Sequence, residues 1–298
     1  MLESCLACLQ AQTLRHTVIV VDNGSTDGTS ERLRASFPHV ALIDSPTNLG
    51  FPAACNRGVA AGSGEVAVLL NNDVEARPTL LAELLAPFSD RRIGSVAAVL
   101  LRPDGTTIDS VGVAVDVTLA GFPRLRGIAA LEAGRREPVL AGPVGGAAAY
   151  RRRAWEDVGG LDEGVLGYGE DVDLALRLQT AGWRTVAAPH AVGLHLGSAS
   201  FGRRSPFQRY HGGFARGYFL RRYAVLTSSA AMRAVATEAI VVGGDLLISR
   251  DLQALRGRVA GWRAARGLSR RPFPPAEAID ASMSFWQSLR QRLTVYRA

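Results

Sequence analysis

The sequence contains no lysine, so all 34 of its basic side chains are arginine. We attribute this bias mainly to codon usage. The lack of lysine still counts against sugar-phosphate nucleotidyltransferases, because that class holds a triphosphate with a glycine-rich loop carrying arginine and lysine. Such an enzyme therefore ranks low among the interpretations of this chain.

Cysteine is also scarce, with only Cys5, Cys8 and Cys55. The stretch "CLAC" has the spacing of a redox motif but lacks its glycine or proline context. No further cysteine or histidine stands near enough to complete a structural zinc site. We therefore expect inert thiols in a reducing compartment.

Long apolar runs are missing as well. None reaches the roughly 18 residues that a membrane-spanning helix needs, and "MLESCLACLQAQT" does not resemble a secretory signal. A hydrophobic content of 47% with 20% charged residues argues against wholesale disorder. These features predict a globular, cytoplasmic protein.

The charge is distributed unevenly along the chain. Residues 1–200 carry 17 arginines against 22 acids, whereas residues 201–298 carry 17 arginines against 5 acids. This asymmetry predicts two parts, 1–205 and a helical, arginine-rich region 206–298. The second part also contains an apolar stretch at 234–248. It could meet anionic lipid on the inner face of the plasma membrane, or be a solvated basic tail; we expect no nucleic-acid partner.

Strand and helix patterns alternate through the first part. Buried strands are expected at 17–21, in "HVALIDS" and at 66–70, with helices between them. This alternation predicts an α/β fold whose mostly parallel sheet is covered on both faces. Ligands gather at the carboxyl ends of such strands. Asp22 and the trio Asn71–Asp73 would then share one rim.

A crowded acidic group opens the helix expected in "GYGEDVDLALRLQTAGW". Glu170, Asp171 and Asp173 occupy its first turn, where acids stabilise a helix N-terminus. Three acids in four positions exceed what capping requires, and such crowding tends to raise a pKa.

Six stretches, taken in order, resemble the family 2 glycosyltransferases, which are inverting enzymes of the GT-A fold. The resemblance covers about residues 1–200, looks nearest to rhamnosyltransferase-like members, and is carried by "VIVVDNGSTDGT", "NLGFPAACNRG", "LLNNDV", "GGAAAYRRRAWEDVGGLDE", "GYGEDVDLALRLQTAGW" and "HAVGLHLGS". It implies transfer of a sugar from a nucleoside-diphosphate sugar, dTDP-rhamnose first and UDP-sugars second. The acceptor would be a saccharide or polyprenyl-linked glycan hydroxyl. The rival interpretation is a non-catalytic or impaired protein that binds sugar nucleotide or membrane.

The resemblance implies a divalent cation, Mg²⁺ or Mn²⁺, that stabilises the leaving diphosphate. Asn71-Asn72-Asp73 matches the D-x-D position of the family, with Asp73 as the carboxylate ligand. Asn71 replaces the first acid, which leaves open a contact with ribose or with a metal-bound water instead of direct ligation. His195 matches a histidine that ligates metal in some relatives. Without the resemblance, an Asn-Asp turn and a structural histidine would be the simpler interpretations.

The same resemblance assigns the remaining site residues. Asp171 matches the general base that takes the proton of the acceptor hydroxyl, with Glu170 as the alternative. The matches to the nucleotide-sugar-binding positions are Asp22, Gly24, Ser25, Asn48, Gly50, Asn56, Arg57, Asn71, Asn72, Gly145 and Gly146.

Family members begin with a buried strand before the helix that residues 2–12 resemble. That strand lies within their sheet, beside the strand that corresponds to the one bearing Asp22. Without it, the backbone along a buried edge would lack partners, which is costly. We therefore expect a sheet lacking its first strand, low stability and weak donor binding for the 298-residue chain.

Overall fold

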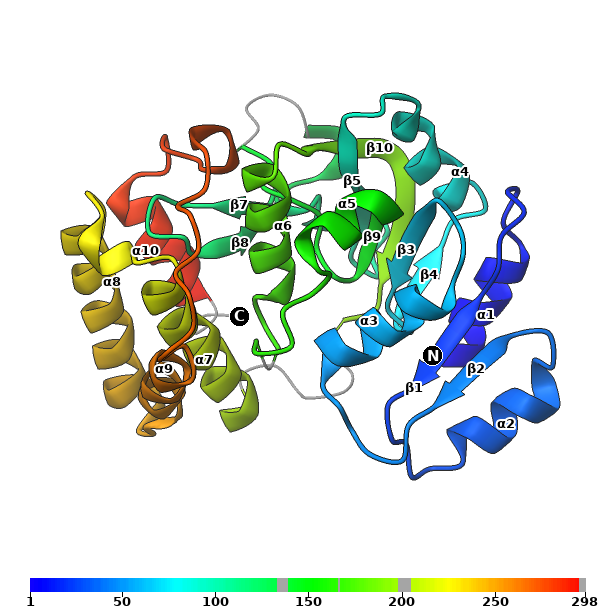
Figure 1. Cartoon of the computed structure of the whole chain (residues 1–298), viewed down its shortest axis with the longest axis horizontal. Coiled ribbons are helices and arrows are strands. Elements are labelled where there is room, and N and C mark those ends of the chain that lie inside the picture. Colours follow the sequence, from blue (N-terminus) through cyan, green and yellow to red (C-terminus); the bar gives the residue numbers. More distant parts are fainter. Residues whose placement is uncertain (133–138, 166, 198–204, 295–298) are drawn as a thin grey trace.

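The computed structural model describes residues 1–132, 139–165, 167–197 and 205–294 (Figure 1). Three sheets make up its β-structure, and the largest has six strands with β3, β9, β5, β10 and β4 in that order and β6 beside β5. The strands are β1 (Ile19–Asp22), β2 (Ala41–Asp44), β3 (Val66–Leu70), β4 (Val74–Ala76), β5 (Ile93–Leu101), β6 (Ile108–Ser110), β7 (Val113–Val115), β8 (Gly121–Pro123), β9 (Ala147–Arg151) and β10 (Arg184–His195).

Helices flank these sheets and make up most of the C-terminal region (Figure 1). The α-helices are α1 (Leu2–Gln10), α2 (Thr29–Ser36), α3 (Phe51–Ala61), α4 (Leu80–Leu85), α5 (Arg152–Val158), α6 (Glu170–Thr180), α7 (Pro206–Arg222), α8 (Ala231–Gly244), α9 (Gln253–Ala264) and α10 (Phe285–Thr294). Short helical turns are η1 (Ala86–Ser89), η2 (Ala130–Glu132), η3 (Val225–Thr227), η4 (Asp245–Ser249) and η5 (Ala276–Ala278). The α/β character predicted from the sequence is confirmed.

The prediction of a mostly parallel sheet is wrong. Among the described strands, only β1 with β2 and β5 with β10 run parallel. The pairs that β9 forms with β3 and β5, and that β4 forms with β10, are antiparallel. The strand that follows the alternating segment is the cause, because β9 inserts between β3 and β5 and reverses the direction. Sequence periodicity does not specify such non-local pairing.

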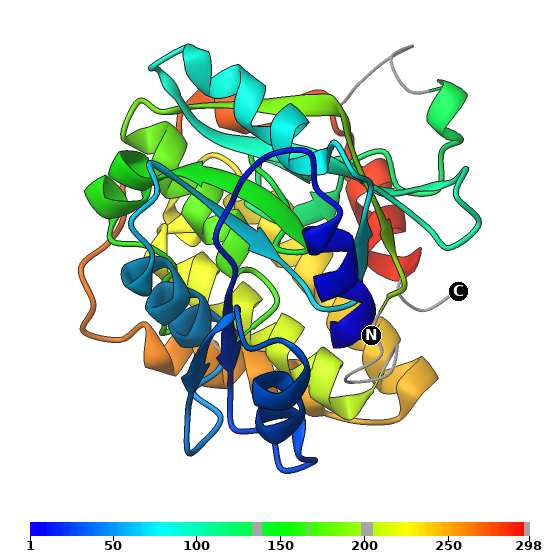
Figure 2. The same cartoon turned by 90° about the vertical axis from the view of Figure 1, so that its right-hand side faces the viewer.

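Strands β1 and β3, which lead to Asp22 and to Asn71–Asp73, belong to two separate sheets. In the described part of the chain, β1 pairs only with β2, and β3 pairs only with β9. Figure 2 shows β1, β2 and α2 apart from the larger sheet. This gap lies where the resemblance places a further strand. It also explains why both strands are half-buried rather than fully buried as predicted: one edge of each is unpaired and lines a cleft.

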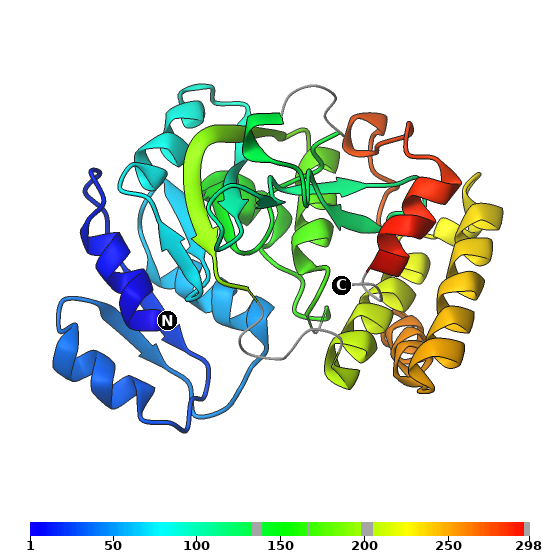
Figure 3. The ribbon, with the colours of Figure 1, turned by 180° about the vertical axis from the view of Figure 1, so that it is seen from behind.

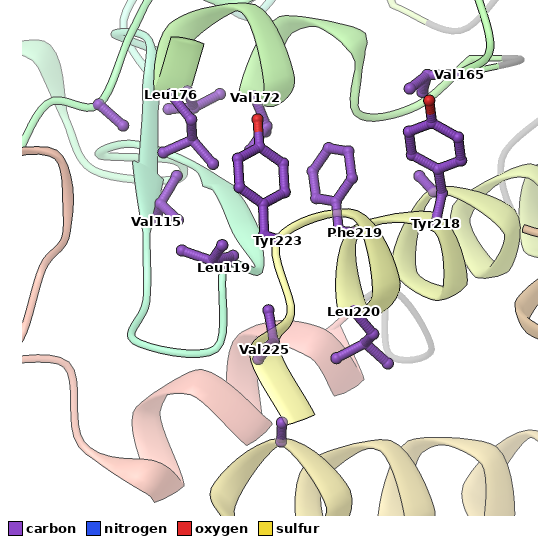
Figure 4. Close-up of a cluster of buried hydrophobic side chains, with 14 of the residues drawn as sticks. Val115, Leu119, Val165, Val172, Leu176, Tyr218, Phe219, Leu220, Tyr223 and Val225 are labelled. Atoms are coloured by element: carbon purple, nitrogen blue, oxygen red, sulfur yellow. The ribbon is translucent and has the colours of Figure 1, made fainter. Parts of the chain in front are cut away.

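The C-terminal helices share a hydrophobic cluster with the α/β part. Val172 and Leu176 of α6 pack with Tyr218 and Phe219 of α7, and Ala234 of α8 belongs to the same cluster (Figure 4). Burial of such side chains stabilises by about 1.5–3 kcal/mol each. The packing fixes α6, whose first turn carries the predicted catalytic acids, against the helical region.

Glycines allow α7 and α9 to pack backbone against backbone. A Cβ atom on Gly217 would lie 1.9 Å from the carbonyl oxygen of Arg258, and one on Gly261 would lie 1.9 Å from that of Phe214. Any larger residue would therefore force these two helices apart.

Candidate active site

One cleft of about 2720 Å³ runs past the carboxyl ends of β1, β3 and β10. Sites for single small ligands usually measure about 300–1,000 Å³, so the cleft has room for more than one ligand. The predicted site residues that line it are Asp22, Ser25, Asn48, Gly50, Asn71, Asn72, Asp73, Gly145, Gly146, Glu170, Asp171 and His195.

Two loops on the β1 side of the cleft are joined through Asn23, which the sequence analysis did not single out. Its side chain donates to Asn48 Oδ1 at 3.1 Å and accepts from the Leu49 amide at 2.8 Å. Gly24 lies behind this contact with φ +83°, and a Cβ there would lie 2.7 Å from the Asn48 nitrogen. Gly24 therefore shapes the loop without lining the cleft.

Asp22 closes the turn after β1. Its Oδ1 accepts the Ser25 amide at 2.9 Å, and its Oδ2 accepts the hydroxyl of Ser30. Burial alone would raise the pKa of Asp22, but the hydrogen bonds from Ser25 and Ser30 outweigh it and lower the pKa. Asp22 is thus held as a carboxylate at the rim.

Asn56 and Arg57 do not join the other predicted nucleotide-binding residues. The positions of α3 that line the cleft are 51, 54, 55, 58, 59 and 61, and helical periodicity turns 56 and 57 away from it. The Asn56 amide instead donates to the Leu161 carbonyl at 3.0 Å and accepts the Leu161 amide at 2.9 Å. Arg57 is exposed. This placement gives no support to their predicted nucleotide contacts.

Asp73 and His195 meet because β4 and β10 are antiparallel neighbours, with His195 opposite Val74. Nε2 of His195 lies 3.4 Å from Asp73 Oδ2. On its other side, Nδ1 of His195 is hydrogen-bonded to Oδ2 of Asp109 at 2.7 Å. These contacts raise the pKa of His195 to about 9, the bond to Asp109 contributing most. The imidazole is thus fixed between two carboxylates.

The sequence analysis did not identify Asp109, which lies on β6. It lies in the weakly periodic middle of the chain, and nothing in "TTIDSVG" distinguishes it. Its other oxygen, Oδ1, is paired with Arg126 at 3.0 Å. Arg126 and Arg102 also line the cleft, and so bring positive charge to it.

Glu170 and Asp171 begin α6 and face the same cleft. Glu170 is 9% exposed, and burial, followed by repulsion from Asp171, raises its pKa to about 7. Burial also raises the pKa of Asp171, whose two oxygens accept the amides of Val172 at 2.7 Å and Gly145 at 3.4 Å. Neighbouring carboxylates with raised pKa values are typical of proton-transfer sites.

Asp173, the third acid of this group, has a structural position. It is fully buried, with Oδ2 accepting Nε of Arg177 at 2.7 Å and Oδ1 accepting the hydroxyl of Tyr223 at 2.9 Å. An ion pair with Arg271 completes its surroundings. Asp173 therefore ties α6 to the C-terminal region, which explains why the first turn holds more acids than capping requires.

Comparison with solved structures shows which fold this chain shares. The solved structures most informative for the fold are a mannosyltransferase from Pyrobaculum calidifontis in complex with GDP-Man and Mn²⁺ (TM-score 0.53, 20% identity, 99% of this chain and 81% of that one) and GalNAc-T7 with UDP, GalNAc and Mn²⁺ (TM-score 0.58, 15% identity, 88% and 53%). Their likeness confirms the GT-A fold.

The sequence comparison gives the family. The profile described as "Glycosyl transferase family 2" matches residues 1–159, and that of "Glycosyl transferase family group 2" matches 133–241. An N-acetylglucosaminyl-diphospho-decaprenol L-rhamnosyltransferase of Mycobacterium tuberculosis is 35% identical over an alignment 228 residues long, which covers 68% of this chain and 74% of the relative. The O-antigen biosynthesis protein RfbC of Myxococcus xanthus is 32% identical over 67% of this chain but only 16% of its own length. The chain belongs to glycosyl transferase family 2 and is rhamnosyltransferase-like, as its motifs indicated.

Proposed function

We propose that the protein is an inverting, metal-dependent transferase acting on a nucleoside-diphosphate sugar, dTDP-rhamnose first and UDP-sugars second. The acceptor is a saccharide hydroxyl on a polyprenyl-linked glycan. The observation that carries the proposal is that the carboxylates of Glu170 and Asp171 line one cleft with Asp73 and His195. The name of the mycobacterial relative, a rhamnosyltransferase acting on a decaprenol-linked sugar, supports the choice of donor and acceptor.

Asp73 and His195 suit a divalent cation. Oδ1 of Asp73 is buried with no hydrogen-bond partner among the described atoms, as expected of an oxygen that awaits a cation. The described residues contain no ready set of three ligands from Cys, His, Asp and Glu, so diphosphate oxygens and water would complete the shell. When bound, Mg²⁺ or Mn²⁺ would act as a Lewis acid on the leaving diphosphate.

Asp171 is the proposed general base, with Glu170 as the alternative. A carboxylate that faces the acceptor can take its hydroxyl proton as the nucleotide leaves from the opposite side of the sugar. The amides of Val172 and Gly145 fix the orientation of Asp171. The raised pKa values of both acids bring them nearer to neutral pH, which favours proton transfer there.

The nucleotide would lie against the loops on the β1 side. Asp22, Ser25 and Asn48 line that end of the cleft, and Asn71 and Asn72 line the cleft next to Asp73. Gly145 and Gly146 leave room for the sugar to approach the backbone.

Membrane association also belongs to the proposal. The strongly basic balance of residues 201–298 favours an anionic surface. No helix within the described residues is long and apolar enough to cross a bilayer.

Donor titration by calorimetry, with and without Mn²⁺, together with a released-nucleotide assay over a panel of donors and acceptors, tests this function. We expect donor binding to require the cation and transfer to follow. Asp73→Ala should abolish the Mn²⁺ dependence of donor affinity. The matched change Glu75→Ala, two residues further on in β4 and not among the residues that line the cleft, should keep it. Donor binding without turnover for every acceptor would instead identify a non-catalytic binding protein.

A further inference from the structure

Helix α8 exposes its apolar face and buries its polar face, which is the reverse of the usual arrangement in a globular protein. Its exposed positions recur at intervals of three and four residues, so they form one face of the helix. Every one of them is apolar: Met232, Val235, Ala236, Ala239 and Ile240. Met232 is 87% exposed and Val235 is 57% exposed. In a helix that packs on a protein core, this face would carry charged side chains.

The polar residues of α8 point inward instead. Glu238 is 9% exposed, and its carboxylate pairs with Arg216 at 2.8 Å, Arg258 at 2.7 Å and Arg292 at 2.6 Å. Burial opposes ionisation, but these three guanidinium groups outweigh it and lower the pKa of Glu238 well below its usual range. Thr237 beside it is fully buried. The ion cluster therefore fixes the orientation of α8 with its apolar face outward.

The apolar face continues beyond α8. In η4, Leu247 is 82% exposed and Ile248 is 67% exposed, and Leu246 is also exposed. On α10, which packs against α8, the indole of Trp286 is 73% exposed. Contiguous exposed apolar surface on a globular protein usually marks an interaction site. We call this set of residues, 232–248 on their exposed side together with Trp286, the α8 face.

The charge around the α8 face indicates its partner. It contains no exposed acid, and arginines flank it: Arg250 follows η4 directly, and Arg290 lies one turn from Trp286 on α10, both exposed. Residues 201–298 as a whole carry 17 arginines against 5 acids. Apolar side chains on one helical face, bordered by arginine and tryptophan, are the features of a helix that lies in a membrane interface.

We propose that the α8 face docks on an anionic lipid bilayer, with Met232, Leu247 and Trp286 inserted at the headgroup level and the flanking arginines on lipid phosphates. Figures 1 and 3 show α8 along the end of the molecule opposite β1 and β2.

The inner side of the same segment reaches the active-site cleft. Val241 and Asp245 line the cleft from α8 and η4, and Gln291 and Arg292 line it from α10. A bilayer on the outer side would therefore lie next to the end of the cleft that is remote from Asp22. A polyprenyl-linked acceptor is anchored in such a bilayer, so docking of the α8 face would bring the cleft to its acceptor. Only this role in acceptor delivery rests on the proposed function; the docking itself does not.

Vesicle flotation of the full chain, without donor or acceptor, tests the proposal. Vesicles of phosphatidylcholine alone are compared with vesicles that also contain phosphatidylglycerol, at low and high salt. We expect binding to the anionic vesicles that decreases with salt. Met232→Glu and Leu247→Glu should each weaken it at least about tenfold, since each replaces an inserted apolar side chain with a charge.

Leu131→Glu is the matched control, because Leu131 of η2 is fully exposed but lies outside the α8 face. Leu131→Glu should bind the anionic vesicles with an affinity within about twofold of that of the unsubstituted chain, because Leu131 is not one of the inserted side chains. Equal binding to neutral and anionic vesicles, unchanged binding of Met232→Glu and Leu247→Glu, or a concentration-dependent dimer that both changes dissociate would overturn the proposal. Transfer to a water-soluble acceptor should persist in both variants, so loss of membrane binding and failure of the proposed function are distinguishable.

Discussion

Nδ1 of His195 is hydrogen-bonded to the carboxylate of Asp109 at 2.7 Å, while Nε2 faces Asp73 at 3.4 Å. A carboxylate on one ring nitrogen fixes the orientation of a histidine, so that the other nitrogen can bind a cation once it has lost its proton. Asp109 is thus a positioning residue for the proposed metal site, although it is not itself a proposed ligand.

Replacing Asp109 should therefore reduce metal affinity. We expect Asp109→Ala to weaken Mn²⁺ binding about 10–100-fold, the usual cost of losing such a partner, and Asp109→Asn, which keeps an oxygen acceptor, to weaken it less. Calorimetric titration of Mn²⁺ into the chain measures the effect. Asp104→Asn is the control, since Asp104 belongs to the exposed turn before β6; equal affinities in all four proteins would contradict the positioning role.

Removing the base should separate binding from chemistry. Asp171→Asn should keep donor affinity and reduce transfer by about 10²–10⁴-fold, the contribution of a positioned base. Glu170→Gln should cost less if Asp171 is the base. Rates come from released nucleotide and affinities from calorimetry. A Glu170→Gln rate below that of Asp171→Asn would assign the base to Glu170 instead.

Several of these features could be read from the sequence, and others could not. Val66–Leu70 and the helix from Glu170 have local signals, namely a continuous apolar run and an acidic first turn, and both are confirmed in type and position. Local patterns do not report which strands pair, so the insertion of β9 was missed. Asp109 depends on the same non-local pairing, because only the sheet brings β6 beside the end of β10.

The apolar stretch at 234–248 shows a related limit. Its hydrophobicity was visible in the sequence, but which side of α8 is buried depends on the arginines that gather around Glu238 from α7, α9 and α10. Those partners are distant in sequence, so the outward direction of the apolar face emerges only from the fold.

The buried pair at the start of α6 should make stability depend on pH. The pKa of Glu170 is about 7 in the folded chain, above its ordinary value of 4.5. Its contribution to stability is then fully present below about pH 4.5 and is lost as the pH rises through 7. We expect the free energy of unfolding of the unsubstituted chain to fall on the order of 2 kcal/mol between pH 5 and pH 8. In Glu170→Gln this decrease should be absent. Urea unfolding at the two pH values measures it, and the same pH dependence in Glu170→Gln as in the exposed control Glu65→Gln would contradict the assignment.

The division of the sheet should be visible in amide exchange. Among the described strands, β1 pairs on one edge only, with β2, whereas β9 is paired on both edges by β3 and β5. A strand whose other edge faces a cleft opens more easily, because fewer hydrogen bonds and apolar contacts must break. We expect the amides of β1 to exchange at least about a hundredfold faster than those of β9, which corresponds to a difference of about 2.7 kcal/mol in opening free energy.

Native-state hydrogen exchange read by mass spectrometry, with peptides covering residues 17–24 and 146–152, makes the comparison within one molecule. Equal protection of the two strands would mean that the gap between β1 and β3 is closed in solution, and the expectation of low stability would then be wrong.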